Sequence, residues 1–286
     1  MSKRILISLA HPDDETFGLG GLILKYVDEG AEVYLICATN GDVGTVPEEM
    51  LANYASISDL RLAELANASE ILGFKEVFTL NYKDSGMMGS DFNEDPDCLW
   101  YQYQHHPEQI EKQLVDIIRQ VRPQVLITFD AFGGYGHPDH IAIHQASLKA
   151  FELAADPAYV SDAEPYQIQK VYYPSLPAFL LKSAILFLKL RRKDPTKLGT
   201  NQDLDLKAVV KNLQPVHTRV SVKDYLDTWD RANACHASQG GGANRFVPLW
   251  FRRNFAAKQS LTRFYPTPVQ NRVDESDLFD GVNLKE

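Results

Sequence analysis

Two short apolar runs in this chain are each followed by a cluster of histidine and aspartate. Residues 5–10 lead directly into His11-Pro12-Asp13-Asp14-Glu15, and residues 125–130 precede His137-Pro138-Asp139-His140. Runs of this length and composition are typical of strands buried on both faces of a parallel sheet. Because open α/β sheets carry their chemistry at the carboxyl ends of such strands, we expect an α/β protein with its site at that edge.

The rest of the first 173 residues alternates between strand and helix patterns. Strands are predicted at 5–9, 32–38, 77–80, 124–130 and 169–173, and helices at 21–30, 56–72, 106–121 and 138 to about 155. This alternation predicts a Rossmann-like, mostly parallel sheet with helices on both faces. In a doubly wound sheet of order 3-2-1-4, the first and fourth strands are neighbours, so both clusters would line one crevice.

Composition limits the functions open to the chain. With 286 residues, 44% of them hydrophobic, and no Pro-, Gly- or Ser-rich linker, one large domain over 1–286 is expected. The net charge of -9 argues against a nucleic-acid partner, because phosphate binding needs clustered Lys and Arg. The apolar run behind the basic start is too short for a signal peptide, and three scattered cysteines favour a reducing, cytoplasmic location.

The two clusters supply the ligands of a catalytic metal. A catalytic zinc site has three protein ligands and one open position, a count that His11, Asp14 and His140 satisfy. Asp13 would then point elsewhere and be free to act as a base. His137 and His140 share the three-residue offset of His11 and Asp14, so one can bind metal while the other faces the substrate. Zinc suits such a site, and ferrous iron accepts the same ligand types.

Each cluster taken alone has a plainer interpretation, since Pro and Asp are ordinary turn formers. Two such clusters at strand ends predicted to be adjacent make a shared site the better explanation. His144 lies one helical turn after His140. It is assigned to packing or to support of the site, because the glutamate base of a His-x-x-x-His metal motif is absent.

The chain resembles the PIG-L or LmbE-like family of zinc-dependent N-acetylglucosaminyl deacetylases, whose members include deacetylases of mycothiol and bacillithiol biosynthesis. The two His-Pro-Asp motifs carry most of the resemblance, which covers most of the chain and implies a variable C-terminal part from about residue 174. Further marks are Gly41-Asp42-Val43-Gly44, Arg61 with Glu64, Leu72-Gly73 and His236-Ala237-Ser238-Gln239.

The resemblance implies a role for each residue of the two motifs. By matched position, His11, Asp14 and His140 would bind zinc. Asp13 would be the general base, and His137 would stabilise the oxyanion or protonate the leaving amine. The implied substrate is a small amino-sugar conjugate that loses acetate.

Three further residues receive roles in the same way. Asp139 would orient His137, and Asp139 or a nearby backbone carbonyl would fix each ligand imidazole. Arg61 is expected to hold sugar hydroxyls or a phosphate. Asp84, in a segment similar to one seen in enzymes of mycothiol metabolism, would contact the sugar, with a polar turn as a nearly equal interpretation.

Other functions stay open at this stage. Within the family, an amidase that cleaves sugar-thiol conjugates is the close alternative. A metal-free glycoside hydrolase would use Asp13 or Asp14 with Glu15 as paired carboxylates. A binding protein without catalysis would keep only the crevice.

The segment 178–190 is apolar but too short and too interrupted for a membrane span. We expect first a buried helix, second a homo-oligomer contact and third a contact with a membrane surface. Trp100, Tyr101 and Tyr103 would stack on a sugar ring or simply pack.

Overall fold

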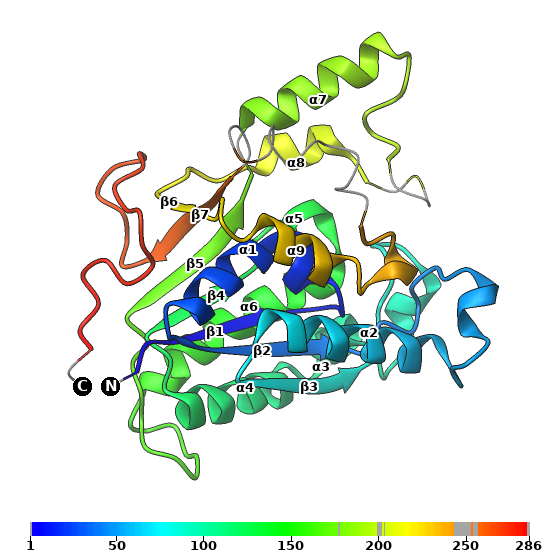
Figure 1. Ribbon diagram of the computed structural model, residues 1–286. Coiled ribbons are helices and arrows are strands. Elements are labelled where there is room, and N and C mark those ends of the chain that lie inside the picture. Colours follow the sequence, from blue (N-terminus) through cyan, green and yellow to red (C-terminus); the bar gives the residue numbers. More distant parts are fainter. Residues whose placement is uncertain are drawn as a thin grey trace.

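The computed structural model describes residues 2–176, 178–198, 202, 204–242, 253 and 257–284. Over these residues one sheet runs through the molecule in the order β3-β2-β1-β4-β5-β7-β6 (Figure 1). Its strands are β1 (Arg4–Leu9), β2 (Glu32–Thr39), β3 (Glu76–Tyr82), β4 (Val125–Thr128), β5 (Lys170–Ser175), β6 (Thr218–Ser221) and β7 (Lys258–Tyr265).

The first five strands are parallel, and the predicted order 3-2-1-4 is confirmed. β1 and β4 are direct neighbours, with Ile5 opposite Val125 and Ser8 opposite Thr128. β7 and β6 extend the sheet in antiparallel orientation, and the sequence did not predict them. β6 is only four residues long and alternates between buried and exposed positions, so it lacks the continuous apolar run that revealed β1 and β4.

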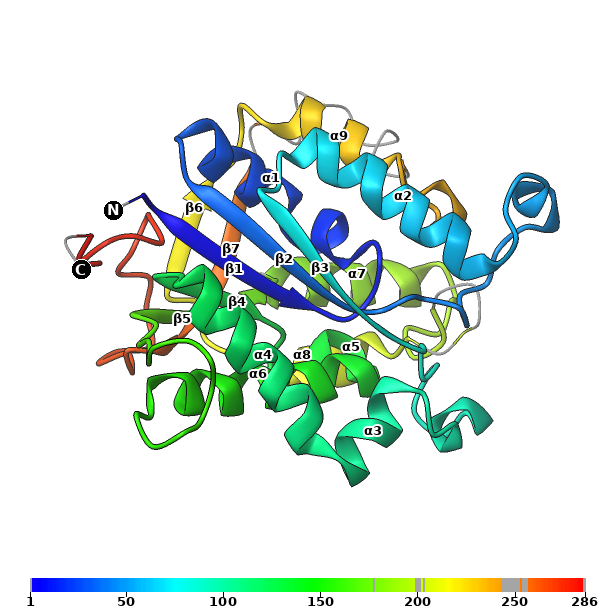
Figure 2. The same ribbon diagram turned by 90° about the horizontal axis from the view of Figure 1, so that it is seen from below.

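Helices cover both faces of the sheet, as predicted (Figure 2). The helices of the described residues are α1 (Asp14–Asp28), α2 (Ile57–Leu72), α3 (Leu99–His105), α4 (Pro107–Val121), α5 (Gly133–Gly136), α6 (Pro138–Ala155), α7 (Ala178–Leu190), α8 (Leu206–Asn212) and α9 (Leu226–Asn233). α1, α2 and α9 lie on one face, and α3, α4 and α6 on the other. Each face has its own apolar core, and buried residues of β1 and β2 contribute to both.

Local signals fix the helix ends that matter for the site. Ser56 caps α2 by accepting a hydrogen bond from the Asp59 amide, and Gly73 ends the helix in the left-handed conformation that glycine adopts at low cost. α6 has Pro138 in its first turn and His137 as its N-cap. Both helices therefore run as the sequence predicted.

α1 begins earlier than predicted, at Asp14 instead of residue 21. The glycines between residues 18 and 21 are poor helix formers, which hid the first turns from a propensity argument. Tertiary packing explains them, because a Cβ on Gly20 or Gly21 would collide with the ring of Trp229 in α9. The early start places the acidic motif in the first turn of a helix, where negative charge is favourable.

The expectation of a buried helix over 178–190 is wrong. α7 has no buried residue, and in Figure 1 it projects from the body of the protein above α8. Its half-buried residues, Leu181, Ala184, Ile185 and Leu188, form one stripe, while Leu190 on the other side is 75% exposed. In the part of the chain that the structure describes, no helix combines the length and the apolar character that crossing a bilayer requires.

Candidate metal and hydrolase site

Two ring nitrogens and one carboxylate from the two motifs form a small triangle at the carboxyl ends of β1 and β4, and each carboxylate oxygen of Asp14 faces one of the nitrogens. His11 Nδ1 lies 3.1 Å from His140 Nε2 and 3.5 Å from Asp14 Oδ2, and His140 Nε2 lies 3.4 Å from Asp14 Oδ1. Ligand atoms about 2.1 Å from one tetrahedral metal ion lie roughly 3.4 Å apart. The spacing of these three side chains therefore fits a metal ion bound between them.

The second nitrogen of each of these two imidazoles already has a partner. His11 Nε2 lies 3.1 Å from Asp139 Oδ2, and His140 Nδ1 lies 3.1 Å from the carbonyl oxygen of Gly133. Such contacts fix the tautomer and turn the remaining nitrogen toward the shared centre. His140 is also held by ring stacking on Phe129, at a centroid distance of 3.8 Å.

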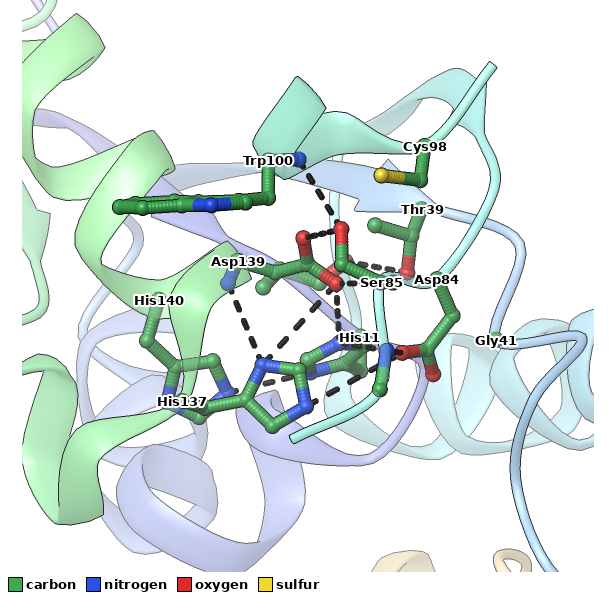
Figure 3. Close-up of polar contacts among 12 residues, drawn as sticks. His11, Thr39, Gly41, Asp84, Ser85, Cys98, Trp100, His137, Asp139 and His140 are labelled. Atoms are coloured by element: carbon green, nitrogen blue, oxygen red, sulfur yellow. Dashed lines mark hydrogen bonds and ion pairs between the residues drawn. The ribbon is translucent and has the colours of Figure 1, made fainter. Parts of the chain in front are cut away.

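Asp139 is fully buried and serves His11 more directly than His137. Its carboxylate accepts hydrogen bonds from the backbone amide of Ser85, at 2.9 Å, and from the Ser85 hydroxyl (Figure 3). The Ser85 oxygen in turn accepts from the Trp100 amide at 2.9 Å. His137 Nδ1 is 3.9 Å from the same carboxylate and accepts a hydrogen bond from the Asp139 backbone amide at 3.2 Å. That the Asp139 side chain orients His137 stays a prediction.

Asp13 stands beside the triangle in an unusual backbone conformation. Its φ of 144° is one that residues with a side chain rarely adopt, and strain of this kind costs about 1–3 kcal/mol. Two contacts maintain it: Arg61 donates to Asp13 Oδ2 at 3.1 Å, and the Asp13 amide donates to Glu15 Oε2 at 3.0 Å. Burial raises the pKa of Asp13 to about 7, and the Arg61 charge opposes that rise.

Arg61 is buried and contacts the loops that carry the motifs. Besides Asp13, its guanidinium donates to the carbonyl oxygens of Pro12 and Gly41, each at 3.0 Å. Gly41 has a φ of 68°, and a Cβ there would collide with the guanidinium. Arg61 therefore organises the site from within the protein, and its predicted contact with a sugar or phosphate stays a prediction.

Asp84 and His137 face each other across the same cluster. Asp84 Oδ1 lies 3.6 Å from His11 Nε2 and 3.9 Å from His137 Nε2 (Figure 3). Burial lowers the pKa of His137 to about 3, helped by the charges of His11 and His140. The ring is therefore neutral, and since Nδ1 accepts the Asp139 amide, Nε2 carries the proton and is the available donor.

The charge balance of the cluster also fits a bound cation. Four aspartates, at 13, 14, 84 and 139, surround the histidines, and Arg61 is the permanent cation among them. Burial lowers the pKa of His11, yet Asp84, Asp139 and Asp14 together hold that pKa well above 6.5. The surrounding carboxylates therefore favour positive charge at this position, and a bound metal ion would supply it.

Sequence reasoning did not find the contacts between the first motif and the C-terminal part. His236 Nε2 lies 2.6 Å from Glu15 Oε1, and both side chains are at most 1% exposed. Two residues on, Ser238 donates its amide and hydroxyl to Glu64, at 2.8 and 2.6 Å. The acidic residue of the first motif and the later histidine were both visible in the sequence, but nothing in their spacing paired them.

The aromatic segment after β3 packs in place. Trp100 and Tyr103 are half-buried against the core formed by α4 and α6, and Tyr101 lies 4.2 Å from the ring of His105. His144 Nδ1 donates to the carbonyl oxygen of Phe129 at 2.6 Å, and the ring of Phe129 stacks on His140. These contacts support packing roles for Trp100, Tyr101 and Tyr103 and a positioning role for His144.

The comparisons with known proteins agree with this geometry. The sequence profile of the PIG-L family, described as GlcNAc-PI de-N-acetylase, matches residues 6–151. A 1D-myo-inositol 2-acetamido-2-deoxy-alpha-D-glucopyranoside deacetylase from Streptomyces scabiei is 35% identical, over 99% of this chain and 90% of its own length. A protein of the same name from Geodermatophilus obscurus is 36% identical, over 98% of both chains.

Solved structures share the fold at low sequence identity. A 4-carboxy-2-hydroxymuconate hydratase from Pseudomonas putida superposes with a TM-score of 0.61 and 18% identity, over 94% of this chain and 99% of its own. At that identity the likeness establishes the fold alone.

Replacing Asp139 with Asn should weaken metal binding by about 10- to 100-fold, because the partner of His11 Nε2 loses its charge. The measurement is a competition titration against a fluorescent chelator. Asp116→Asn on the outer face of α4, where the carboxylate pairs with Lys112, is the matched control. Equal affinity in both variants would show that Asp139 does not support the metal ligand.

Replacing Glu15 with Ala should lower the free energy of unfolding by about 2–4 kcal/mol, since His236 and the Asp13 amide would lose a buried charged partner. Chemical denaturation measures this change. Glu29→Ala, at the exposed end of the same helix, should change stability far less. A similar loss in both variants would contradict the importance of the Glu15 contacts.

Proposed function

This chain belongs to the PIG-L family, and from that premise we propose that it is a metal-dependent hydrolase that removes the N-acetyl group of an N-acetylglucosamine conjugate. The observation that carries the proposal is the triangle of His11, Asp14 and His140, with Asp13 held beside it. Zinc is the metal that we propose, with ferrous iron as the alternative that the same ligands accept.

The names of the relatives favour a small amino-sugar conjugate as the substrate. We place the reaction in the cytoplasm, where the reducing environment suits three cysteines that the structure leaves unbridged. We also propose that residues 1–286 act as one deacetylase domain with a variable part from about residue 174. Two contacts support this: β7 pairs with β5 in the same sheet, and His236 contacts the first motif.

A bound zinc ion would polarise the acetyl carbonyl and lower the pKa of a water molecule toward neutrality. We propose that Asp13 takes the proton of that water, because Arg61 holds its carboxylate beside the ligand triangle and Glu15 holds its backbone amide. The water oxygen bonds to the carbonyl carbon as the proton moves to Asp13. A base with a pKa near 7 is well matched to this transfer at neutral pH.

His137 supplies the hydrogen bond to the developing oxyanion. Its neutral ring has the proton on Nε2, pointing into the cluster beside Asp84. When the C–N bond breaks, the proton held by Asp13 passes to the leaving nitrogen, and acetate and a free amine result. His137 thus acts as a donor in its neutral form, and Asp13 takes both proton-transfer roles.

Asp84 and Arg61 complete the proposed site. Asp84 is buried within the cluster and has a carboxylate oxygen 3.7 Å from Arg61 Nη1. We propose that Asp84 accepts a hydrogen bond from a sugar hydroxyl. We also propose that Arg61, which is paired with Asp84, contacts the sugar.

A metal-free glycosidase is disfavoured by the position of Glu15. That carboxylate is fully buried and is already bonded to His236 and to the Asp13 amide. It is not available as the second member of a catalytic pair.

Asp13→Asn should leave the metal content near that of the wild type and lower turnover by about 10²- to 10⁴-fold, because the amide cannot take a proton. Amine release from an N-acetylglucosamine-inositol substrate and elemental analysis measure the two quantities. Asp14→Asn is the contrasting variant, because it should lose the metal as well. Wild-type turnover in Asp13→Asn would exclude Asp13 as the base.

Removal of the metal by exhaustive chelation should abolish acetate release, and adding back zinc or ferrous iron should restore it. The ion that restores the higher turnover identifies the better cofactor. Full activity of the chelated protein, confirmed metal-free by elemental analysis, would refute the metal-dependent mechanism.

A further inference from the structure

α7 presents an apolar face that the described part of the chain leaves exposed. Of the fifteen exposed large apolar side chains among the described residues, six lie between residues 176 and 190. Leu186, Phe187 and Leu190 follow Phe179 by seven, eight and eleven residues, a spacing that places all four on one side of the helix. They are between 56% and 75% exposed. Apolar surface concentrated in this way marks a contact with something outside the domain.

The opposite side of α7 is already used within the protein. Its half-buried residues Leu181, Ala184, Ile185 and Leu188 form the stripe toward the body, and α7 contacts α8. Because one side is packed, the groove of a partner protein cannot enclose this helix. The exposed face instead forms a ridge on the outside of the molecule, where Figure 1 shows α7 projecting from the body.

Basic residues surround the exposed face. Lys182 and Lys189 lie along one flank of α7, and Arg191-Arg192-Lys193 follow its last turn. All five side chains are exposed, and the guanidinium carbon of Arg191 lies 4.9 Å from the centre of the Phe187 ring. The segment 178–193 contains no Asp or Glu, although the whole chain has a net charge of -9. The apolar face therefore lies in a local excess of positive charge, which favours an anionic partner.

The exposure of α7 leaves the other two expected partners, a second copy of the chain and a membrane surface. A second copy packed through the same face would bring two basic segments together, and like charges in contact oppose association. A bilayer with anionic lipids offers apolar chains to the ridge and phosphate groups to the cations, whose long side chains can reach the headgroups. With 13 residues, α7 is shorter than the roughly 20 needed to cross a bilayer, so it would lie in the plane of the surface.

We propose that α7 docks the protein on the surface of an anionic phospholipid bilayer. Phe179, Leu186, Phe187 and Leu190 enter the boundary between headgroups and lipid chains, and the basic residues at 182, 189 and 191–193 contact the phosphates. The docking face lies outside the cluster to which we assign catalysis, and this inference does not rest on the proposed deacetylase function.

Co-sedimentation of the full-length protein with vesicles measures the docking directly. Binding to an equal mixture of phosphatidylcholine and phosphatidylglycerol should be at least about tenfold stronger than binding to phosphatidylcholine alone, since each Lys or Arg near an anionic surface favours binding roughly fivefold. High salt should reduce the difference, because it screens these charges. Equal binding to both kinds of vesicle, or binding to neither, would overturn the proposal.

Substitutions separate the apolar face from the charges. Leu186→Glu puts a carboxylate in the middle of the face and should weaken binding to the mixed vesicles by at least about tenfold. Val160→Glu, at a residue 91% exposed in the loop after α6, adds the same charge elsewhere and should bind like the wild type. The triple variant Arg191→Gln, Arg192→Gln, Lys193→Gln should lose most of the preference for anionic vesicles. Equal losses in Leu186→Glu and Val160→Glu would contradict a docking face on α7.

A fluorescent reporter shows which part of the protein enters the lipid. Phe187→Trp places an indole on the exposed face of α7, and Phe92→Trp places one at a 50% exposed residue between β3 and α3. Lipids brominated on their chains should quench the added fluorescence of Phe187→Trp and leave that of Phe92→Trp unchanged. Quenching in neither variant, or equal quenching in both, would show that α7 is not the inserted element.

Light scattering tests the second copy as the alternative occupant. A protein that binds no vesicles and forms a dimer, which Leu186→Glu converts to a monomer, would make α7 an interface between copies and the membrane proposal wrong. Vesicle binding involves no substrate, so its failure leaves the deacetylase proposal standing. Vesicle binding by a protein that releases no acetate would refute the deacetylase proposal and leave the docking face in place.

Discussion

The parallel pairing of β1 with β4 is the constraint on which the site depends. Backbone hydrogen bonds align Ser8 with Thr128, so the loops that leave both strands begin at the same edge of the sheet. More than a hundred residues separate His11 from His140 in sequence, yet their ring nitrogens lie 3.1 Å apart. A shift in that register would move one motif away from the other, and no local contact within either motif could compensate.

Burying so many ionisable groups in one cluster is energetically unfavourable, and hydrogen bonds from fixed partners offset that penalty. Ser85 donates twice to Asp139, the Gly133 carbonyl meets His140, and Arg61 spans the loops after β1 and β2. These partners are buried, and a cluster with fixed dipoles needs little rearrangement when charge develops during a reaction. The strained φ of Asp13 belongs to the same arrangement, because Arg61 and Glu15 hold both the side chain and the backbone amide of that residue.

Local patterns in the sequence were sufficient to predict most strands and helices of the alternating α/β part of the fold. Continuous apolar runs revealed β1, β2 and β4, and the caps Ser56 and Gly73 marked α2, because each signal involves neighbouring residues only. The early start of α1, the pairing of Glu15 with His236 and the support of Asp139 by Ser85 arise from contacts distant in sequence. The exposure of α7 could not be predicted either, since its apolar composition is that of a buried helix.

The residues proposed for the reaction and the residues that line the neighbouring cavity come mostly from different parts of the chain. The family profile covers the portion that holds both motifs, and a hydratase has the same fold, so the sheet alone does not determine the reaction. The residues to which we assign the reaction, Asp13, His137 and the proposed metal ligands, all precede residue 151. A cavity of about 730 Å³ beside Asp14 and His140 is lined in large part by residues that follow 174, including residues of α7 and α8. Changes in that later part can therefore alter which conjugate is accepted while the cluster that would cleave the amide stays the same.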